Sequence, residues 1–477
     1  MGVITLKWKR SPLSEGPGLS MQSMTRREAL TRSLAGIPLL SGAETSAAAP
    51  TPLAIARTTV IDGTGAVFSD QTVLIEGDRI RSVAKAGSVP LPTGATIVLG
   101  AGRYLIPGLW DCHAHLSYYK ASALPVMLAN GVTALRDMGG ALSELDQWRD
   151  EIDDGVRPGP RIFRAGPILN GRQFNEFQIV VADAAEARGA VRSVNSAGVD
   201  FVKVHAAISR EAYYGVEAEC RRLNLPYAGH MPRAIEPEEA SNAGQLSIEH
   251  IGAFADRFSS QGVSDDDMTR ALIRFREEKA PALFGLFARN KTWFTPTLIA
   301  SKSSIRPGDH QPDPRDRYVS ASCKKITAEL LMRPSYQSFL SSDSAARQTR
   351  DFNQLIPLVG LLHRQGVRLL AGTDCAVSII YPGFSLHEEL ELLVAAGLKP
   401  MESLLTATAN PASALGRKDL GIVRVGNLAD LVLLDASPLD DIRNTRKIRA
   451  VISRGKMFGR ADLDRLLEHA ADEANNT

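Results

Sequence analysis

Side chains that can bind metal recur along this chain, and the densest group follows an apolar run. Residues 111–115 read Asp-Cys-His-Ala-His. In an extended chain, residues two apart share a face, so the imidazoles of His113 and His115 can point at one ion. An isolated His-x-His pair is weak support for a metal site. Its place directly after an apolar, strand-like segment strengthens the case.

Four more residues of this kind lie in or at the ends of apolar segments. They are Lys203, His230, His250 and Asp374. A lysine in a strand buried on both faces needs a partner, because an unpaired ammonium there is very costly. Lys203 is therefore either the ion-pair partner of a carboxylate such as Asp374, or a modified lysine whose new carboxylate bridges two metals. Each histidine alone is more often a core residue, but six such side chains at five strand ends favour a metal centre.

Eight apolar segments alternate with helical stretches and would position these side chains. They are 105–111, 132–138, 161–166, 201–205, 225–230, 246–251, 293–298 and 367–374. Near-continuous apolar strands, each followed by a helix, are typical of a parallel sheet closed as a (β/α)8 barrel, whose active site lies at the carboxyl ends of the strands. An open doubly wound sheet is the alternative, but no Gly-x-Gly-x-x-Gly or phosphate loop follows the first segment. The pattern predicts an α/β fold with a TIM-type (β/α)8 barrel over 105–416.

Short strand-like segments flank this barrel. Runs of β-branched residues, broken by Gly and Asp-Gly turns, fill 51–104, and a similar pattern returns over 417–460. Neither stretch can form a full core alone, so we expect both to pair into one small composite β-sandwich domain. A C-terminal helix or tail follows at 461–477. The segment 299–365 is longer than one crossover helix and is expected to add helices over the barrel mouth.

The composition is that of a folded globular protein without an electrostatic partner. The 477 residues include 55 Lys and Arg against 53 Asp and Glu, a formal charge of +2, and 44% are hydrophobic. This balance argues against nucleic acid as a partner and excludes general disorder. No apolar run approaches the roughly 20 residues that span a bilayer, so stable membrane insertion is not expected. The four cysteines are too scattered for a disulfide scaffold.

Residues 1–50 are predicted to be an N-terminal extension that contains a twin-arginine-type export signal. Arg26 and Arg27 precede a modestly apolar stretch at 29–40, and three alanines at 47–49 supply small residues for cleavage. This route exports folded proteins, which suits an enzyme that acquires its metal in the cytoplasm. We therefore expect a periplasmic or secreted protein. The alternative is a cytoplasmic protein with an amphipathic or disordered tail.

Over 52–460 the chain resembles the amidohydrolase superfamily, in particular its imidazolonepropionase-like and Xaa-Pro dipeptidase-like branch. The phrases that carry the resemblance are LIPGLWDCHAHL at 105–116, SIEHI at 247–251, AGTD at 371–374 and ATANPASALG at 407–416. The order His-x-His, Lys, His, His, Asp agrees with it as well. The resemblance implies a binuclear metal site inside the barrel.

Each of the six strand-end residues has a role by this resemblance. The expected ligands are His113, His115 and Asp374 for the more buried metal, and His230 and His250 for the more exposed one. Lys203, carbamylated by carbon dioxide, would bridge two divalent ions, as an anionic ligand between paired metals requires. Imidazole and carboxylate ligands suit zinc above all, with manganese, iron and cobalt as alternatives.

The resemblance also implies a reaction, the hydrolysis of an amide C–N bond in a dipeptide, an N-acyl amino acid or a cyclic amide. Asp374 would be the catalytic residue, taking the proton from the attacking hydroxide and passing it to the leaving amine. The same site could instead hydrolyse a lactone, ester or organophosphate, since loops decide the substrate. Deamination fits less well, because deaminases of this superfamily usually lack the bridging lysine. A catalytically silent binding barrel would have lost ligands that are all present here.

Two loops depart from the dipeptidase pattern. Dipeptidases of this branch usually carry a Gly-Gly-His type loop after strand three and a Thr-Gly-Gly run shortly after the lysine. Here residues 170–173 read Asn-Gly-Arg-Gln, and residues 206–209 read Ala-Ala-Ile-Ser. The departure argues against Xaa-Pro specificity. The substrate is expected to be a small molecule, and a homo-oligomer is compatible with the sequence.

The candidates for substrate binding are few. Arg172 could bind a substrate carboxylate with both arms of its guanidinium, or be a solvated loop residue. Tyr213 and Tyr214 at the start of a helix, together with His205, are candidates for orienting a carbonyl or carboxylate. His205 could instead be a core residue. His387 is interpreted as a helix-capping residue or a support of a metal ligand.

Overall fold

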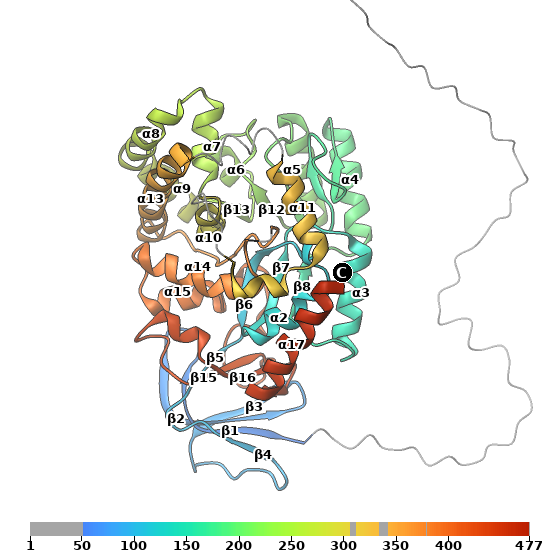
Figure 1. Ribbon diagram of the computed structural model, residues 1–477, viewed down its shortest axis with the longest axis vertical. Helices are drawn as coiled ribbons and strands as arrows, with labels where there is room; N and C mark the ends of the chain where they lie inside the picture. The colour runs from blue at the N-terminus through green and yellow to red at the C-terminus, as the bar shows by residue number, and fades with distance from the viewer. Residues whose placement is uncertain (1–50, 306–311, 333–341, 378, 477) are drawn as a thin grey trace, which may run out of the picture. The chain divides into compact units, whose positions relative to one another are not determined.

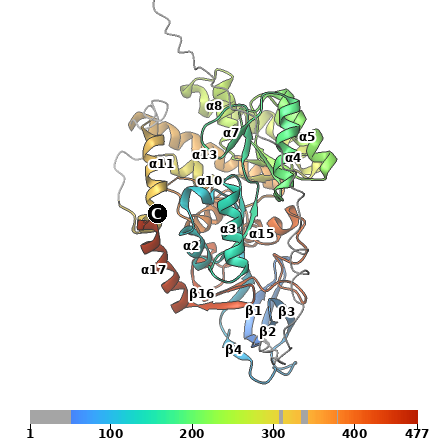
Figure 2. The ribbon, with the colours of Figure 1, turned by 90° about the vertical axis from the view of Figure 1, so that its right-hand side faces the viewer.

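The computed structural model describes residues 51–305, 312–332, 342–377 and 379–476. The described chain has a mixed α/β fold, drawn in Figure 1 and from the side in Figure 2. The export signal predicted within 1–50 lies outside these residues and stays a prediction.

One eight-stranded sheet joins the two ends of the described chain. Its strands are β1 (Leu53–Ile61), β2 (Val67–Glu76), β3 (Arg79–Lys85), β4 (Thr96–Leu99), β5 (Tyr104–Pro107), β15 (Leu431–Leu434), β16 (Ile448–Ser453) and β17 (Lys456–Gly459). The order is β17-β16-β15-β5-β1-β2-β3, with β4 beside β1. β15 runs antiparallel to β5 and sets Leu433 opposite Leu105. The segments predicted to form a composite β-sandwich do pair with each other, but in one sheet instead of two, at the lower end of Figure 1.

The other nine strands form two sheets in which every pair is parallel. One sheet has the order β6-β7-β8, with β6 (Leu109–Ala114), β7 (Val132–Asp137) and β8 (Arg161–Arg164). The second has the order β10-β9-β11-β12-β13-β14, with β9 (Ile168–Asn170), β10 (Gln178–Val180), β11 (Val202–Val204), β12 (Tyr227–His230), β13 (Ser247–Glu249) and β14 (Trp293–Thr295). All residues of β6 and β7 are buried. Burial on both faces is why these strands are apolar without alternation.

The segment predicted as the eighth barrel strand connects the two parallel sheets. On one side the amide of Leu370 donates to the carbonyl of Phe294 at 2.9 Å, and on the other the amide of Cys112 donates to the carbonyl of Ala371 at 2.9 Å. Only single bridges form at each edge, so residues 367–374 are not a regular strand. The segment nevertheless lies between β14 and β6, and this brings its last residue, Asp374, beside β6.

The prediction of a single first barrel strand at 105–111 is wrong, because the structure divides that segment between two sheets. β5 pairs with β1 and β15 in the eight-stranded sheet, whereas β6 begins the parallel strands. Gly108 lies between them, and a Cβ there would come within 1.9 Å of Thr133 Oγ1. The chain passes from one sheet to the other at Gly108, where a side chain would clash with Thr133. Both halves are apolar, so hydrophobicity alone could not separate them.

Helices connect the parallel strands and continue to the C-terminus. They are α1 (Leu116–Tyr119), α2 (Ala123–Ala129), α3 (Leu142–Asp153), α4 (Ala184–Ser196), α5 (Arg210–Leu223), α6 (Pro237–Asn242), α7 (Ala253–Ser260), α8 (Asp265–Glu278), α9 (Ala280–Asn290), α10 (Leu298–Ser303), η1 (Pro314–Tyr318), α11 (Ala321–Leu331), α13 (Ser342–Arg364), α14 (Phe384–Ala395), α15 (Pro400–Thr406), α16 (Ala409–Ala414), η3 (Ile442–Arg446) and α17 (Arg460–Asn476). The segment 299–365 contains additional helices, as predicted. Among the described residues, no helix is long and apolar enough to cross a membrane.

Candidate metal centre

Four histidines and an aspartate meet where the parallel strands end. His113 lies in β6, His230 is the last residue of β12, and His250 directly follows β13. His115 precedes α1, and Asp374 ends the segment that connects β14 to β6. Because these strands run parallel, their carboxyl ends bring side chains from distant parts of the sequence to one place.

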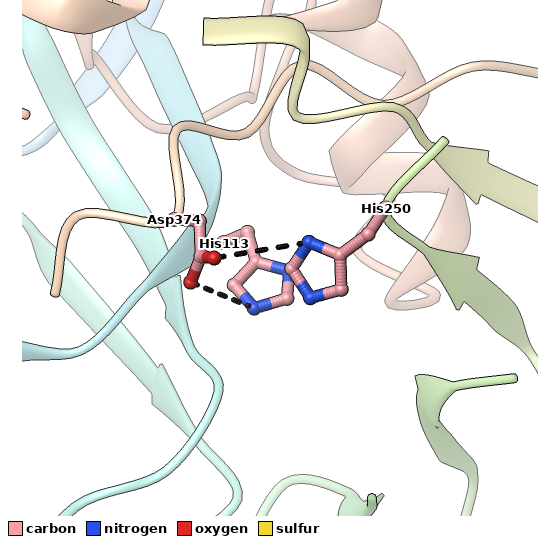
Figure 3. A group of neighbouring side chains, drawn as sticks. All are labelled: His113, His250 and Asp374. Atoms are coloured by element: carbon pink, nitrogen blue, oxygen red, sulfur yellow. Dashed lines mark ion pairs between the residues drawn. The ribbon is translucent and has the colours of Figure 1, made fainter. Parts of the chain in front are cut away.

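Asp374 is central to this group. Its Oδ1 atom lies 3.5 Å from Nε2 of His113 and 3.5 Å from Nε2 of His115. Its Oδ2 atom lies 3.8 Å from Nδ1 of His250. Figure 3 shows the carboxylate facing the rings of His113 and His250. One ligand atom from each of these three residues lies within 4.8 Å of the others, a separation at which they could hold one metal ion.

Lys203 and His230 complete the set of six predicted ligands. The Nζ atom of Lys203, which is wholly buried in β11, lies 3.4 Å from Nε2 of His113. The ring of His230 lies 4.5 Å from that of His250, between centroids, and among the described residues its buried Nδ1 atom has no hydrogen-bond partner. Buried polar atoms are rarely left without a partner. An unpaired imidazole nitrogen beside other donors is what a metal-binding group would present.

The protonation states of these residues fit metal binding. Burial lowers the pKa of His113, His230 and His250, with nearby Lys203 lowering each further, so the imidazoles are neutral near pH 7. Burial would raise the pKa of Asp374, but the histidines and Lys203 outweigh it and lower that pKa below its usual range. Burial lowers the pKa of Lys203 to about 8. Neutral imidazoles and an ionised carboxylate are the forms that bind divalent metals.

A cavity of about 600 Å³ opens onto this group. Four of the six predicted ligands line it, namely His115, Lys203, His230 and Asp374. His205 also lines it, and its ring lies 3.9 Å from that of His230, between centroids. Pockets of this size typically hold small-molecule ligands. The cavity is therefore the place where a substrate would reach the centre.

Comparison with known proteins decides the family. Residues 104–458 match the model of the amidohydrolase family. The chain belongs to that family. Ochratoxinase of Aspergillus niger is 24% identical over 396 residues, covering 74% of this chain and 75% of that protein. Imidazolonepropionase of Streptomyces griseus is 25% identical over 380 residues, covering 78% of this chain and 87% of that protein.

Solved structures agree on the fold of this amidohydrolase. A bottromycin amidohydrolase has a TM-score of 0.72 at 23% identity, covering 88% of this chain and 90% of its own. A Xaa-Pro dipeptidase has a TM-score of 0.64 at 21% identity, covering 86% of this chain and 100% of its own. The resemblance found in the sequence is confirmed. The protein is a hydrolase that acts on amide carbon–nitrogen bonds, and its family is generally metal-dependent.

The amidohydrolase holds His113 in place through charged residues that sequence reasoning missed. The Nδ1 atom of His113 lies 2.9 Å from Oε2 of Glu249, and Arg136 donates to both oxygens of Glu249 at 2.8 and 2.9 Å. All three side chains are almost wholly buried. With Nδ1–H bonded to the carboxylate, Nε2 keeps its lone pair for a metal. The available signal was a pair of charged residues, Arg136 and Asp137, in one otherwise largely apolar strand and a single one, Glu249, in another.

A third missed residue, Asp111, fixes the turn that carries Asp374. Its carboxylate accepts hydrogen bonds from the amide of Thr373 at 3.0 Å, the hydroxyl of Thr373 at 2.6 Å and the amide of His113 at 3.1 Å. Two of the predicted ligands also have strained backbones, since φ is 57° at Asp374 and 69° at His250. A non-glycine residue in this region costs on the order of 1–3 kcal/mol, and such strain gathers at functional sites.

The structure places only some of the predicted substrate-binding residues at the cavity. His205 lines the cavity, and Arg172 lies exposed with its guanidinium 4.3 Å above the ring of Phe174, a residue of the lining. Tyr213 is buried and donates to Gln245, whereas Tyr214 lies on the surface of α5. Neither tyrosine lines the cavity, so the expectation that they orient a substrate is not supported. The start of a helix does not tell which of its faces meets the site.

The structure also corrects the interpretation of His387. It neither caps α14 nor supports a ligand. Its Nε2–H donates to the carbonyl of Asn130 at 3.1 Å, and its Nδ1 atom lies 2.9 Å from the hydroxyl of Thr445. It therefore ties α14 to the end of α2 and to η3, inside the core.

Proposed function

We propose that this amidohydrolase binds two divalent metal ions, best matched by zinc, and hydrolyses the amide bond of a dipeptide, an N-acyl amino acid or a cyclic amide. The observation that supports this is that all six predicted ligand residues, which come from five separate segments of the chain, converge beside one cavity. Imidazole and carboxylate are common ligands of zinc. His113, His115 and Asp374 would hold one ion, and His230 and His250 the other.

Lys203 is proposed to be the bridging ligand in carbamylated form. Its Nζ atom lies 3.4 Å from Nε2 of His113, and burial disfavours its charged form, which lowers the pKa of Lys203 to about 8. Addition of the neutral amine to carbon dioxide, with loss of a proton, turns this group into a carboxylate. An anion there would replace a poorly matched cation with the ligand that two adjacent divalent ions require.

The residues of the site have separate tasks in the proposed reaction. The bound ions would supply a hydroxide nucleophile at neutral pH and polarise the scissile carbonyl. Asp374, ionised and within reach of the cavity, would take the proton of the attacking water and deliver it to the leaving nitrogen. Glu249 and Arg136 would keep His113 in the tautomer whose Nε2 faces the centre.

The arrangement of the strands is part of the proposal. We infer that both parallel sheets and residues 367–374 together form the (β/α)8 barrel expected from the sequence. The hydrogen bonds of residues 367–374 to β14 and β6 support closure on one side. On the other side, the amide of Asp200, just before β11, donates to the carbonyl of Arg164 in β8 at 2.9 Å.

A substrate screen tests the proposed activity. Protein reconstituted with zinc is assayed against matched amides and lactones, with amine release measured for the first and acid release for the second. We expect amides to be cleaved with the higher kcat/KM. Faster cleavage of the lactones would contradict the proposal and favour the alternative chemistry.

Export through a twin-arginine signal is proposed from the sequence alone. A mature N-terminus near residue 50, found by sequencing protein recovered outside the cytoplasm, would support it. An intact Arg26-Arg27 pair in that protein would contradict it.

A further inference from the structure

The lining of the cavity combines predicted metal ligands with an apolar part, the aromatic end, whose rings lie next to histidines of the centre. Tyr118, Phe174 and Phe177 line the aromatic end, together with Ile168 and Ile326. Phe174 is 38% exposed, so its ring is accessible to a group that binds in the cavity.

Aromatic rings lie on both sides of the ligand histidines. The ring of Tyr118 is edge-on to that of His115, with centroids 6.0 Å apart, and edge-on to that of Phe177 at 5.3 Å. On the other side, the ring of Phe174 lies 5.5 Å from that of His205, which contacts His230. A group entering the cavity thus meets aromatic surface on either side before it reaches the centre.

Hydrogen bonds fix the loop that carries two of these rings. The amide group of Asn175 donates to the hydroxyl of Tyr118 at 2.5 Å, and its oxygen accepts from the amide of Phe177 at 2.9 Å. The amide of Phe174 donates to Oε1 of Gln178 at 3.0 Å. Because the rings are held before a substrate arrives, less entropy is lost when it binds.

The charges at this end of the cavity are negative. Glu176, from the same loop, and Glu329, from α11, line it. Within the described residues, neither carboxylate has a hydrogen bond or an ion pair. The nearby cation, Arg172, lies over Phe174 and is not part of the lining. A substrate carboxylate placed here would meet two like charges.

Resting on the proposed function, we propose that the substrate is an amide with an uncharged aromatic ring on one side of the scissile bond. The ring would stack between Phe174 on one side and Tyr118 and Phe177 on the other. Offset and edge-to-face contacts between such rings are favourable beyond the area they bury. Glu176 and Glu329 would disfavour substrates that carry a carboxylate at the same place.

Two matched series of amides test this inference with the zinc-loaded protein. The first varies the acyl group, as N-benzoyl-, N-acetyl- and N-succinyl-leucine. The second varies the amine side, as the N-acetyl derivatives of phenylalanine, alanine and aspartate. In one of the series, kcat/KM should be highest for the ring-bearing member, by about tenfold or more, and lowest for the member with the added carboxylate.

Two variants separate binding of the ring from other effects. F174A should reduce the preference for the ring severalfold while leaving metal content unchanged. The control F68A removes a ring that is 47% exposed in β2 of the eight-stranded sheet, and it should leave the preference as it is. E329Q should raise kcat/KM for the member with the added carboxylate relative to the others.

The outcomes distinguish this inference from the proposed function. Cleavage of amides without a ring preference in either series, or a preference that F174A leaves intact, would overturn the inference alone. If no amide is cleaved, the proposed function fails. Calorimetric binding of the same compounds still decides the inference, because the ring-bearing members should bind more tightly than their acetyl or alanine counterparts.

Discussion

At the scale of single residues, Asp374 carries the most specific part of the account. Its carboxylate faces three histidines and lies beside the cavity. D374N keeps the shape of the side chain and one oxygen that can bind metal, but it removes the proton acceptor. We expect turnover to fall by more than about 100-fold, which is the usual contribution of general acid–base catalysis. The metal content should be largely kept. Near-normal turnover in D374N would remove the proposed role.

The Glu249 carboxylate should set the metal affinity of the site through His113. E249Q keeps the volume but weakens the acceptor for the Nδ1–H of His113, so the affinity for zinc should fall about 10–100-fold. Competition with a chromophoric chelator measures it. E219Q is the control, since Glu219 is also buried but pairs with Arg222 on α5, away from the site. Equal affinities in both variants would show that Glu249 has only a structural role.

The sequence predicted which metal-competent side chains come together, but not the residues that support them, for a physical reason. His113, His250 and Asp374 lie in or directly after apolar segments, and parallel strands bring the ends of such segments together whatever the details of packing. Arg136 and Glu249 are different, because a buried charge is tolerated only beside its partner. That partner lies more than a hundred positions along the chain, so the pair could not be predicted from local pattern.

At the scale of elements, the contact between β11 and β12 positions two of the predicted ligands, Lys203 and His230. Gly229 makes it possible, with φ of 140°, and a Cβ there would come within 2.1 Å of the carbonyl oxygen of Val204 and 3.0 Å of Lys203 Cδ. G229A should separate the strands. We expect it to lower the free energy of unfolding by about 1–3 kcal/mol, as overpacking does, and to reduce bound zinc.

A matched glycine serves as the control for G229A. Gly244 also has a positive φ, but a Cβ there would meet no atom within 4 Å. G244A should therefore cost stability through backbone strain alone and leave metal binding as it is. Denaturant titration together with metal analysis compares the two variants, and unchanged zinc binding in G229A would contradict the proposed placement of Lys203 and His230.

His387 gives the contact of α14 with α2 and η3 a predictable pH dependence. Burial, and secondarily Arg446, lowers the pKa of His387 to about 3. A histidine whose pKa is lower in the folded state stabilises the fold above its unfolded pKa of about 6.5, and this contribution is lost as the pH falls toward 3. The free energy of unfolding should therefore fall between pH 6.5 and 4. In H387Q, which keeps both hydrogen bonds without titrating, the fall should be smaller; an identical slope would contradict this.

Strands could be predicted from the sequence where a short apolar segment corresponds to a single strand. Six of the eight apolar segments, from 132–138 to 293–298, contain parallel strands. The first segment proved to be two strands in different sheets, and the last forms only single bridges. The pairing of both segments depends on which strands lie beside them at the junction with the eight-stranded sheet. The hydrophobic pattern of the sequence does not predict those neighbours.

At the scale of the whole molecule, the two ends of the described chain are joined around the parallel strands. β15 pairs with β5, which leads directly through Gly108 into β6 and its metal-competent histidines. The overall charge of +2 gave no indication of a site. The strong local field lies inside, where Asp374, Glu249 and Asp111 are buried or partly buried beside the histidines. The net charge sums over all residues and therefore hides a buried cluster of charges. The metal-competent residues at successive strand ends were the sequence feature that indicated the site.

The central claim is a two-metal hydrolytic site, and a titration of metal-free protein with zinc tests it most directly. Bound zinc and amide hydrolysis are measured on the same samples, in the presence of bicarbonate to supply carbon dioxide for Lys203. The account predicts that activity reaches its plateau at two equivalents of bound zinc and that K203A does not reach it. Full activity with less than one equivalent, or with no metal bound, would contradict the account.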